Sequence, residues 1–181
     1  MSITRNLANK LTAVRIGIIP FIMYLALSEL ELLALSLFIV AIITDLLDGY
    51  VARSREQISA FGKFADPIVD KILITAVFVI FVQKGSLTAV PVVIILGREF
   101  LVTGLRLLAL SEDKVIAASS LGKAKMISHS ALIINIFLNE HWKLHWTEVL
   151  KPRLVELSVV LAIISAAHYF YKNRKVFKGG F

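Results

Sequence analysis

The sequence predicts an all-α integral membrane protein with six transmembrane helices, and three features support this prediction. Of the 181 residues, 57% are hydrophobic, and the mean hydropathy is +0.80. A soluble domain carries about 45–50% apolar residues, so part of the apolar surface here must face something other than a core. The apolar residues also gather in long runs, each close to the ~20 residues that a helix needs to cross a bilayer. Short polar connections separate the runs.

The first half of the chain contains three of these runs. A polar and basic segment, 1–11, leads into the run at 12–28. Glu29 separates that run from the second, at 31–50. The polar stretch SREQISAFGK then turns the chain back into the third run, at 64–83. These short connections predict antiparallel neighbouring helices.

The second half continues the pattern with runs at 88–109, 119–138 and 153–171. The segment 139–151 carries both tryptophans, which are typical of helix ends at a membrane surface. A basic tail, 172–181, follows the last run. Nothing in the composition divides the chain, so we predict a single domain over 1–181.

The distribution of lysine and arginine predicts the orientation of the helices. If both termini are cytoplasmic, the basic residues on the outer side are Lys84, Lys143, Lys151 and Arg153, and all the others lie on the inner side or at inner helix ends. Membrane proteins keep their basic residues mainly on the cytoplasmic side. The net charge of +7 is then explained by topology and anionic lipid, and no nucleic-acid partner is expected. We predict a multi-pass protein of the cell (inner or plasma) membrane.

Carboxylates interrupt the second and third apolar runs. Asp45 and Asp48 are three residues apart and Asp66 and Asp70 four apart, so each pair shares one helix face. A charge at membrane depth costs roughly 2.5–3.5 kcal/mol on insertion scales, which makes it a candidate functional group. Converging carboxylates repel unless a cation lies among them, and oxygen ligands without His or Cys suit Mg²⁺, Mn²⁺ or Ca²⁺. The alternative is a structural salt-bridge cluster in which the partners are Arg15, Arg53 and Lys71.

The stretch from Asp45 to Asp70, called here the acidic motif, reads D-x2-D-G-x2-A-R-x8-G-x3-D-x3-D. At every fixed position it resembles the motif of the CDP-alcohol phosphotransferase family of membrane enzymes. Members transfer a phosphatidyl or similar group from a CDP-linked donor to an alcohol and release CMP. The resemblance implies that Asp45, Asp48 and Asp66 bind divalent metals and that Asp70 is the general base with a secondary metal contact. It further implies that the donor's cytidine and pyrophosphate bind at Asp45, Gly49, Ala52, Arg53, Gly62 and Asp66.

Other expectations also come with the resemblance or with the carboxylate count. Two ions, Mg²⁺ or Mn²⁺, would balance four carboxylates, and such pairs clamp transferring phosphoryl groups. The expected architecture is a polar, metal-containing cavity that opens to the cytoplasmic side, so the active site is cytoplasmic. A homodimer is expected from the family.

Three flanking stretches, NLANKLTAVR, GREFLVTGLR and LGKAKM, resemble the bacterial phosphatidylglycerophosphate synthases of this family. That resemblance implies CDP-diacylglycerol as the donor and sn-glycerol 3-phosphate as the acceptor. Clustered cations suit a phosphate dianion, because Arg offers a bidentate fork and Lys a point charge. The predicted acceptor-phosphate residues are Thr12, Arg15, Arg98, Arg106, Lys123 and Lys125. Met126 stands where Thr is usual, which puts a hydroxyl role at that position in doubt.

Several alternatives remain open at this point. Arg98 can pair with an acid for purely structural reasons, and its neighbour Glu99 can partner another cation. Lys123 and Lys125 can serve topology alone. A sister enzyme would use inositol phosphate, serine or another alcohol as its acceptor. A divalent-cation transporter could use the same carboxylates, although transport sites usually lie near the midplane of the membrane. The lone His129 is predicted to hydrogen-bond a neighbouring helix.

Overall fold

The structure, a computed structural model, describes residues 3–54, 60–111 and 120–174 of the chain. Within these ranges the side chains of 3–13, 15, 45–54, 60–67, 69–70 and 110–111 lie outside the described set. All the regular secondary structure of the described part is helical. Its six helices are α1 (Ile3–Leu27), α2 (Glu31–Ser54), α3 (Ala60–Gln83), α4 (Ala89–Ser111), α5 (Ser120–Trp142) and α6 (His145–Lys172).

Each predicted apolar run corresponds to one of these helices, so the all-α prediction is confirmed for the described residues. Two boundaries differ from the apolar runs. Helix α1 begins at Ile3, well before the apolar run does, and most of 139–151 is helical because only Lys143 and Leu144 separate α5 from α6. Hydropathy marks the part of a helix that suits lipid, whereas backbone hydrogen bonds continue the helix into polar sequence.

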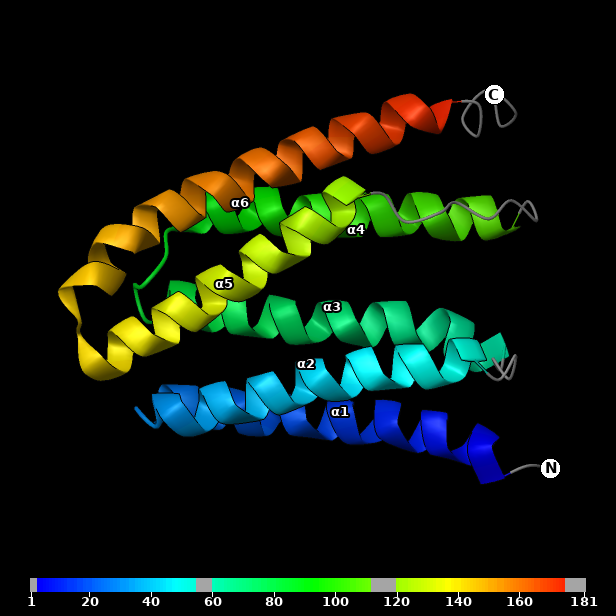
Figure 1. Ribbon diagram of the computed structural model, residues 1–181, viewed down its shortest axis with the longest axis horizontal. Coiled ribbons are helices and arrows are strands. Elements are labelled where there is room, and N and C mark those ends of the chain that lie inside the picture. The colour runs from blue at the N-terminus through cyan, green and yellow to red at the C-terminus, as the bar shows by residue number, and fades with distance from the viewer. Residues whose placement is uncertain (1–2, 55–59, 112–119, 175–181) are drawn as a thin grey trace. The chain divides into compact units, whose positions relative to one another are not determined.

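The chain divides into two compact units, unit 1 (residues 1–84) and unit 2 (residues 85–181). In unit 1, α1 packs against both α2 and α3. The end of α2 and the start of α3 lie at the same end of this unit as the start of α1 (Figure 1). Its core includes the fully buried side chains of Ile22, Phe38, Phe78 and Phe81. These large side chains come from all three helices, so their burial fixes the helices against one another.

The opposite end of unit 1 is held by Lys84, which follows α3. Its Nζ donates to the carbonyl oxygen of Ala26, near the end of α1, at 3.0 Å, and to Glu31 Oε1, at the start of α2, at 3.1 Å. The backbone turn between α1 and α2 has Glu29 at φ 60°, in the left-handed region. A single lysine therefore joins the ends of the three helices.

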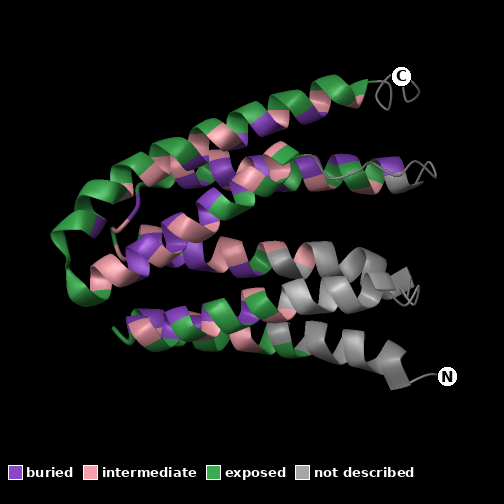
Figure 2. Ribbon diagram, viewed as in Figure 1, coloured by how far each residue is buried: buried purple, intermediate pink, exposed green. Residues whose placement is uncertain are grey.

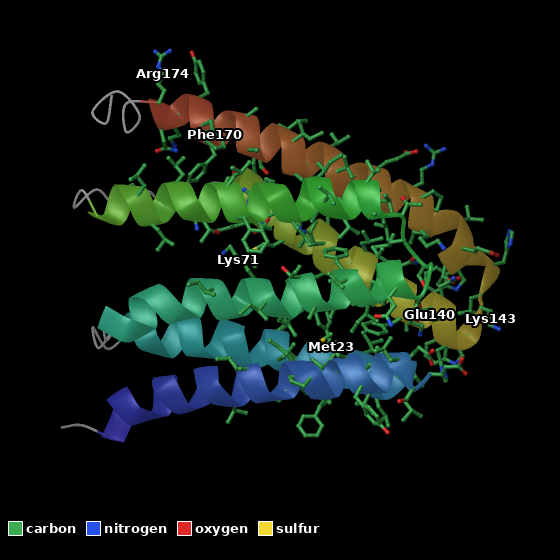
Figure 3. The ribbon with its side chains drawn as sticks, turned by 180° about the vertical axis from the view of Figure 1, so that it is seen from behind. Met23, Lys71, Glu140, Lys143, Phe170 and Arg174 are labelled. Carbon is green, nitrogen blue, oxygen red and sulfur yellow. The ribbon has the colours of Figure 1, made fainter. Side chains whose placement is uncertain are left out.

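In unit 2, α6 packs against both α4 and α5. The α5–α6 turn has Lys143 at φ 48°, and Thr147 Oγ1 donates to Asn139 Oδ1 across it at 2.7 Å. Figure 3 shows Glu140 and Lys143 at this turn, and Ser86, ahead of α4, hydrogen-bonds Glu140. The tight turn makes α5 and α6 antiparallel, so polar residues at intervals along both helices meet in the interior.

Buried and exposed residues alternate along the described helices (Figure 2). Large apolar side chains such as Val93, Leu101 and Ile163 are among the exposed ones. Among the described residues, α6 alone meets the length and hydropathy of a membrane span in full. Shorter apolar helical segments occur at Ile16–Leu27, Glu31–Thr44 and Lys71–Gln83. The apolar exposed surface agrees with a protein that contacts lipid along its helices.

Replacing Lys84 with methionine is expected to destabilise the protein. Glu31 is 7% exposed, and the loss of its cation would leave a buried carboxylate poorly satisfied, at a cost of about 1–3 kcal/mol. Thermal unfolding of the purified protein in detergent measures the effect. The matched control is Arg153→Met, which breaks an exposed pair with Glu156 at 3.8 Å and is expected to change little. Equal shifts for both variants would contradict this account of Lys84.

Candidate functional site

The acidic motif occupies the end of α2 and the beginning of α3. Asp45 and Asp48 lie within α2, and Asp66 and Asp70 lie within α3. The helical backbone therefore gives each pair the spacing that puts both residues on one face of its helix. Both helix ends lie at the same end of unit 1 (Figure 1). The four side chains themselves are outside the described residues.

The remaining predicted site residues of unit 1 are also described by their backbone alone. Gly49, Ala52 and Arg53 lie on α2, Gly62 lies on α3, and the predicted acceptor residues Thr12 and Arg15 lie on α1. Their side chains fall outside the described set, so their roles remain predictions. Among the side chains that are described, no group of three or more His, Cys, Asp and Glu residues gathers. As metal ligands, the carboxylates of the acidic motif suit hard divalent ions.

Unit 2 brings two of the predicted acceptor cations together through Glu99. Arg98 Nη1 donates to Glu99 Oε1 at 2.9 Å, and Lys125 of α5 donates to the same oxygen. All three residues are buried, with 8%, 9% and 6% of their surfaces exposed. We call these residues the Glu99 cluster. It places two cations around one carboxylate in the interior of unit 2.

Helix α6 closes the other side of this cluster. Arg98 Nε donates to Ser165 Oγ at 3.1 Å, and both groups are buried. One turn after Lys125, the buried His129 hydrogen-bonds the backbone of Ser158 on α6. The prediction that His129 contacts a neighbouring helix is therefore confirmed. Polar groups of all three helices in unit 2 thus share one interior region.

Arg106, two turns beyond Arg98 on α4, is also held by α6. Its Nε donates to the hydroxyl of Tyr169 at 2.8 Å, and its guanidinium carbon lies 5.4 Å from the centroid of the Tyr169 ring. Arg106 is exposed, whereas Tyr169 is only 3% exposed. The geometry thus fixes an accessible guanidinium against a buried ring, which suits recognition of a planar or tetrahedral oxyanion.

Lys123 does not join these contacts. It is exposed in the first turn of α5, and two residues of helix put it on a different side from Lys125. Met126 is also exposed, at 56%, so position 126 points away from the buried side of α5 that carries Lys125. The role of Lys123 at the acceptor phosphate remains a prediction.

Sequence reasoning missed Ser165 and Tyr169. Both lie on α6, which carries none of the motif residues, and both contacts join residues more than 60 positions apart, at separations of 67 and 63. The available signal was their spacing of four residues in the mostly apolar second half of α6. That spacing puts both polar groups on one helix face.

The model of a protein family, described as CDP-alcohol phosphatidyltransferase, matches residues 5–169. The chain belongs to this family. The match includes the whole acidic motif and reaches into both units, and it confirms the membership predicted from the motif. Members of the family are generally dependent on divalent metals and associated with membranes.

Curated relatives extend over almost the whole chain. A Bacillus subtilis protein named CDP-diacylglycerol–glycerol-3-phosphate 3-phosphatidyltransferase is 35% identical, over 96% of this chain and 97% of that protein. A Rickettsia felis protein of the same name is 37% identical, over 98% of this chain and 100% of that protein. An Arabidopsis thaliana protein named CDP-diacylglycerol–glycerol-3-phosphate 3-phosphatidyltransferase 1, chloroplastic/mitochondrial, is 32% identical, over 78% of this chain and 52% of that protein.

Glu99→Gln is expected to destabilise unit 2, because a neutral amide would face two buried cations. Breaking a buried ion pair typically costs about 3–5 kcal/mol. Adding Lys125→Met restores the original charge balance, so the double variant should be more stable than Glu99→Gln alone. Denaturant unfolding of the single and double variants measures this coupling. Strictly additive losses would show that Glu99 and Lys125 do not interact.

Proposed function

We propose that this chain transfers the phosphatidyl group from CDP-diacylglycerol to sn-glycerol 3-phosphate, giving phosphatidylglycerophosphate and CMP. The observation that carries the proposal is the similarity over nearly the full length to proteins that bear the name of this activity. The acidic motif supports the same reaction class, because every fixed position of the family motif is present. The reaction belongs to glycerophospholipid synthesis.

In this proposal the acidic motif binds the donor. Asp45, Asp48 and Asp66 hold two divalent ions, Mg²⁺ or Mn²⁺, and Asp70 adds a secondary contact. Bound ions of this kind neutralise the pyrophosphate and stabilise negative charge on the leaving group. The small Gly49, Ala52 and Gly62 leave space for the CDP group.

Arg53, one turn beyond Gly49 on α2, meets the anionic part of the donor. Its guanidinium carries a permanent positive charge and a fork of donors that matches phosphate oxygens. It therefore completes a donor site built from α2 and α3.

The cations of α4 and α5 recognise the acceptor phosphate. Arg106 offers an exposed guanidinium fixed by Tyr169, and Arg98 and Lys125 add two positive charges beside Glu99. Inositol or serine would need no such charge, whereas a phosphorylated alcohol does. Thr12, Arg15 and Lys123 complete the proposed set of acceptor residues.

The chemical step is an in-line displacement. Asp70 removes the proton from the 1-hydroxyl of sn-glycerol 3-phosphate, and the oxygen attacks the phosphorus that bears diacylglycerol. The bond from that phosphorus to the bridging oxygen breaks, and CMP leaves with the electron pair. One phosphodiester bond forms as one phosphoanhydride bond breaks, so no covalent enzyme intermediate is needed.

The proposed setting is the cell membrane, with six spans and with both termini and the active site on the cytoplasmic side. The diacylglycerol tails of the donor then remain in lipid while its polar group reaches the protein.

A homodimer is part of the proposal. Within unit 2, a Cβ added at Gly97 or Gly104 of α4 would meet no atom within 4 Å, and small residues of this kind let a second helix approach closely.

Asp70→Asn is expected to reduce CMP release by several orders of magnitude, because an amide cannot accept the acceptor's proton. The variant should still insert into the membrane and bind the metal, since the other carboxylates remain. CMP release in mixed micelles and metal binding by calorimetry measure the two properties. Glu156→Gln, an exposed substitution on α6, is the control. Near-normal CMP release by Asp70→Asn would exclude Asp70 as the base.

The acceptor is tested by CMP release from CDP-diacylglycerol with sn-glycerol 3-phosphate, inositol phosphate, serine or glycerol supplied separately. The cations proposed to bind the acceptor predict that sn-glycerol 3-phosphate is preferred by at least about tenfold over glycerol, which corresponds to one charge-assisted hydrogen bond. Activity confined to an unphosphorylated alcohol would contradict this role of the cations. Metal-ion flux through reconstituted vesicles without CMP formation would instead favour a transporter.

A further inference from the structure

Helix α6 carries two buried polar side chains, Ser165 and Tyr169, at 1% and 3% exposure. They are four residues apart and therefore lie on one face of the helix. Each accepts a hydrogen bond from the Nε of an arginine on α4, namely Arg98 and Arg106. The same face of α6 thus accepts a hydrogen bond from the Nε of each arginine.

The choice of Nε matters for what the arginines can bind. A guanidinium has five N–H donors, one on Nε and four on the two Nη atoms. A hydrogen bond at Nε fixes the plane of the group, yet the two Nη atoms can still form a bidentate contact with an oxyanion. For the exposed Arg106, this orientation gives a prepared fork at low entropic cost.

Tyr169 is itself held firmly. Its ring is part of a buried cluster with Val102, Leu105 and Ala109 of α4, and Phe170 packs against this cluster. Figure 3 shows Phe170 on the last turns of α6. Because the ring is fixed by packing, its hydroxyl presents a fixed acceptor to Arg106, and its face adds a cation–π contact.

Ser165 is held in a comparable way. Its hydroxyl donates to the carbonyl oxygen of Ala162 at 3.1 Å, which directs a lone pair toward Arg98 Nε. Arg98 is held on its other edge by Glu99. The buried arginine is therefore fixed from two helices, and α6 supplies one of the two contacts.

We propose that Tyr169 is a positioning residue for acceptor recognition: it orients Arg106 to bind the phosphate of the acceptor, and Ser165 holds Arg98 by the same kind of hydrogen bond. The inference rests on the proposed function, because it specifies how the acceptor site of that function is built. It assigns a role to α6, the helix outside the recognised motifs. A purely structural role for Tyr169 would depend on its ring and not on its hydroxyl.

The test compares Tyr169→Phe with the wild-type protein in mixed micelles. Phenylalanine keeps the ring in the buried cluster but removes the acceptor of the Arg106 hydrogen bond. We expect the KM for sn-glycerol 3-phosphate to rise about 3–10-fold, with kcat and the KM for CDP-diacylglycerol within about twofold. Unchanged KM for sn-glycerol 3-phosphate would overturn the proposal.

Two matched controls are available on the same helix. Tyr171→Phe removes a hydroxyl from a tyrosine that is 71% exposed, and no change in KM is expected. Ser165→Ala should raise the KM for sn-glycerol 3-phosphate, whereas Ser158→Ala, at a buried serine whose Oγ makes no hydrogen bond in the described structure, should leave it unchanged. Equal effects of the test and control variants would overturn the proposal.

A coupling experiment separates positioning from packing. Lysine lacks the Nε–H that Arg106 donates to Tyr169. In an Arg106→Lys background, the further change Tyr169→Phe should therefore alter the KM for sn-glycerol 3-phosphate less than twofold. A full 3–10-fold effect in that background would mean that Tyr169 acts independently of Arg106, and the proposal would fail.

A binding measurement distinguishes this inference from the proposed function. The affinity of the protein for inorganic phosphate, measured by calorimetry, should be about 3–10-fold weaker for Tyr169→Phe than for wild type. That result would support the arginine site even if the wild-type protein released no CMP with sn-glycerol 3-phosphate, which would refute the proposed function alone. Equal phosphate affinities, or none in wild type, would overturn the inference.

Discussion

The arrangement of unit 2 depends on the cost of burying charge in an apolar helical protein. Arg98 and Lys125 are both buried, and both donate to one carboxylate oxygen of Glu99. Without that carboxylate the two cations would repel each other in a medium that screens charge poorly. The pairing in turn requires α4 and α5 to meet at this depth, while Ser165 of α6 completes the contacts of Arg98. The packing of the three helices and the placement of the cations therefore depend on each other.

Unit 2 gathers predicted acceptor cations among polar groups of its own helices. Arg98 and Lys125 share the carboxylate of Glu99, and Tyr169 orients Arg106. In unit 1 the acidic motif has the opposite character, since its carboxylates need cations. A donor that carries a pyrophosphate and binds with metal ions, and an acceptor that carries a phosphate, match these two requirements. Family membership and the names of the relatives agree with the reaction class.

Much of the fold was predictable, because apolar runs of membrane length mark helices directly. The start of α1 and the helical character of 139–151 were not, since hydropathy reports lipid contact and not backbone hydrogen bonding. The placement of the acidic motif on two helices was predictable, since Asp45 and Asp48 lie on α2 and Asp66 and Asp70 on α3, whereas the roles of their side chains remain predictions. The roles of Ser165 and Tyr169 depend on how α6 packs on α4. A serine or tyrosine in an apolar helix gives no sign of a partner more than 60 residues away.

The central claim is that buried and oriented cations select a phosphorylated acceptor. Equilibrium binding of labelled sn-glycerol 3-phosphate to the purified protein, with unlabelled competitors, tests it most directly. The account predicts that inorganic phosphate displaces the label and that glycerol at the same concentration does not, because the charge-assisted contacts go to the phosphate. Displacement by glycerol but not by phosphate would contradict the account.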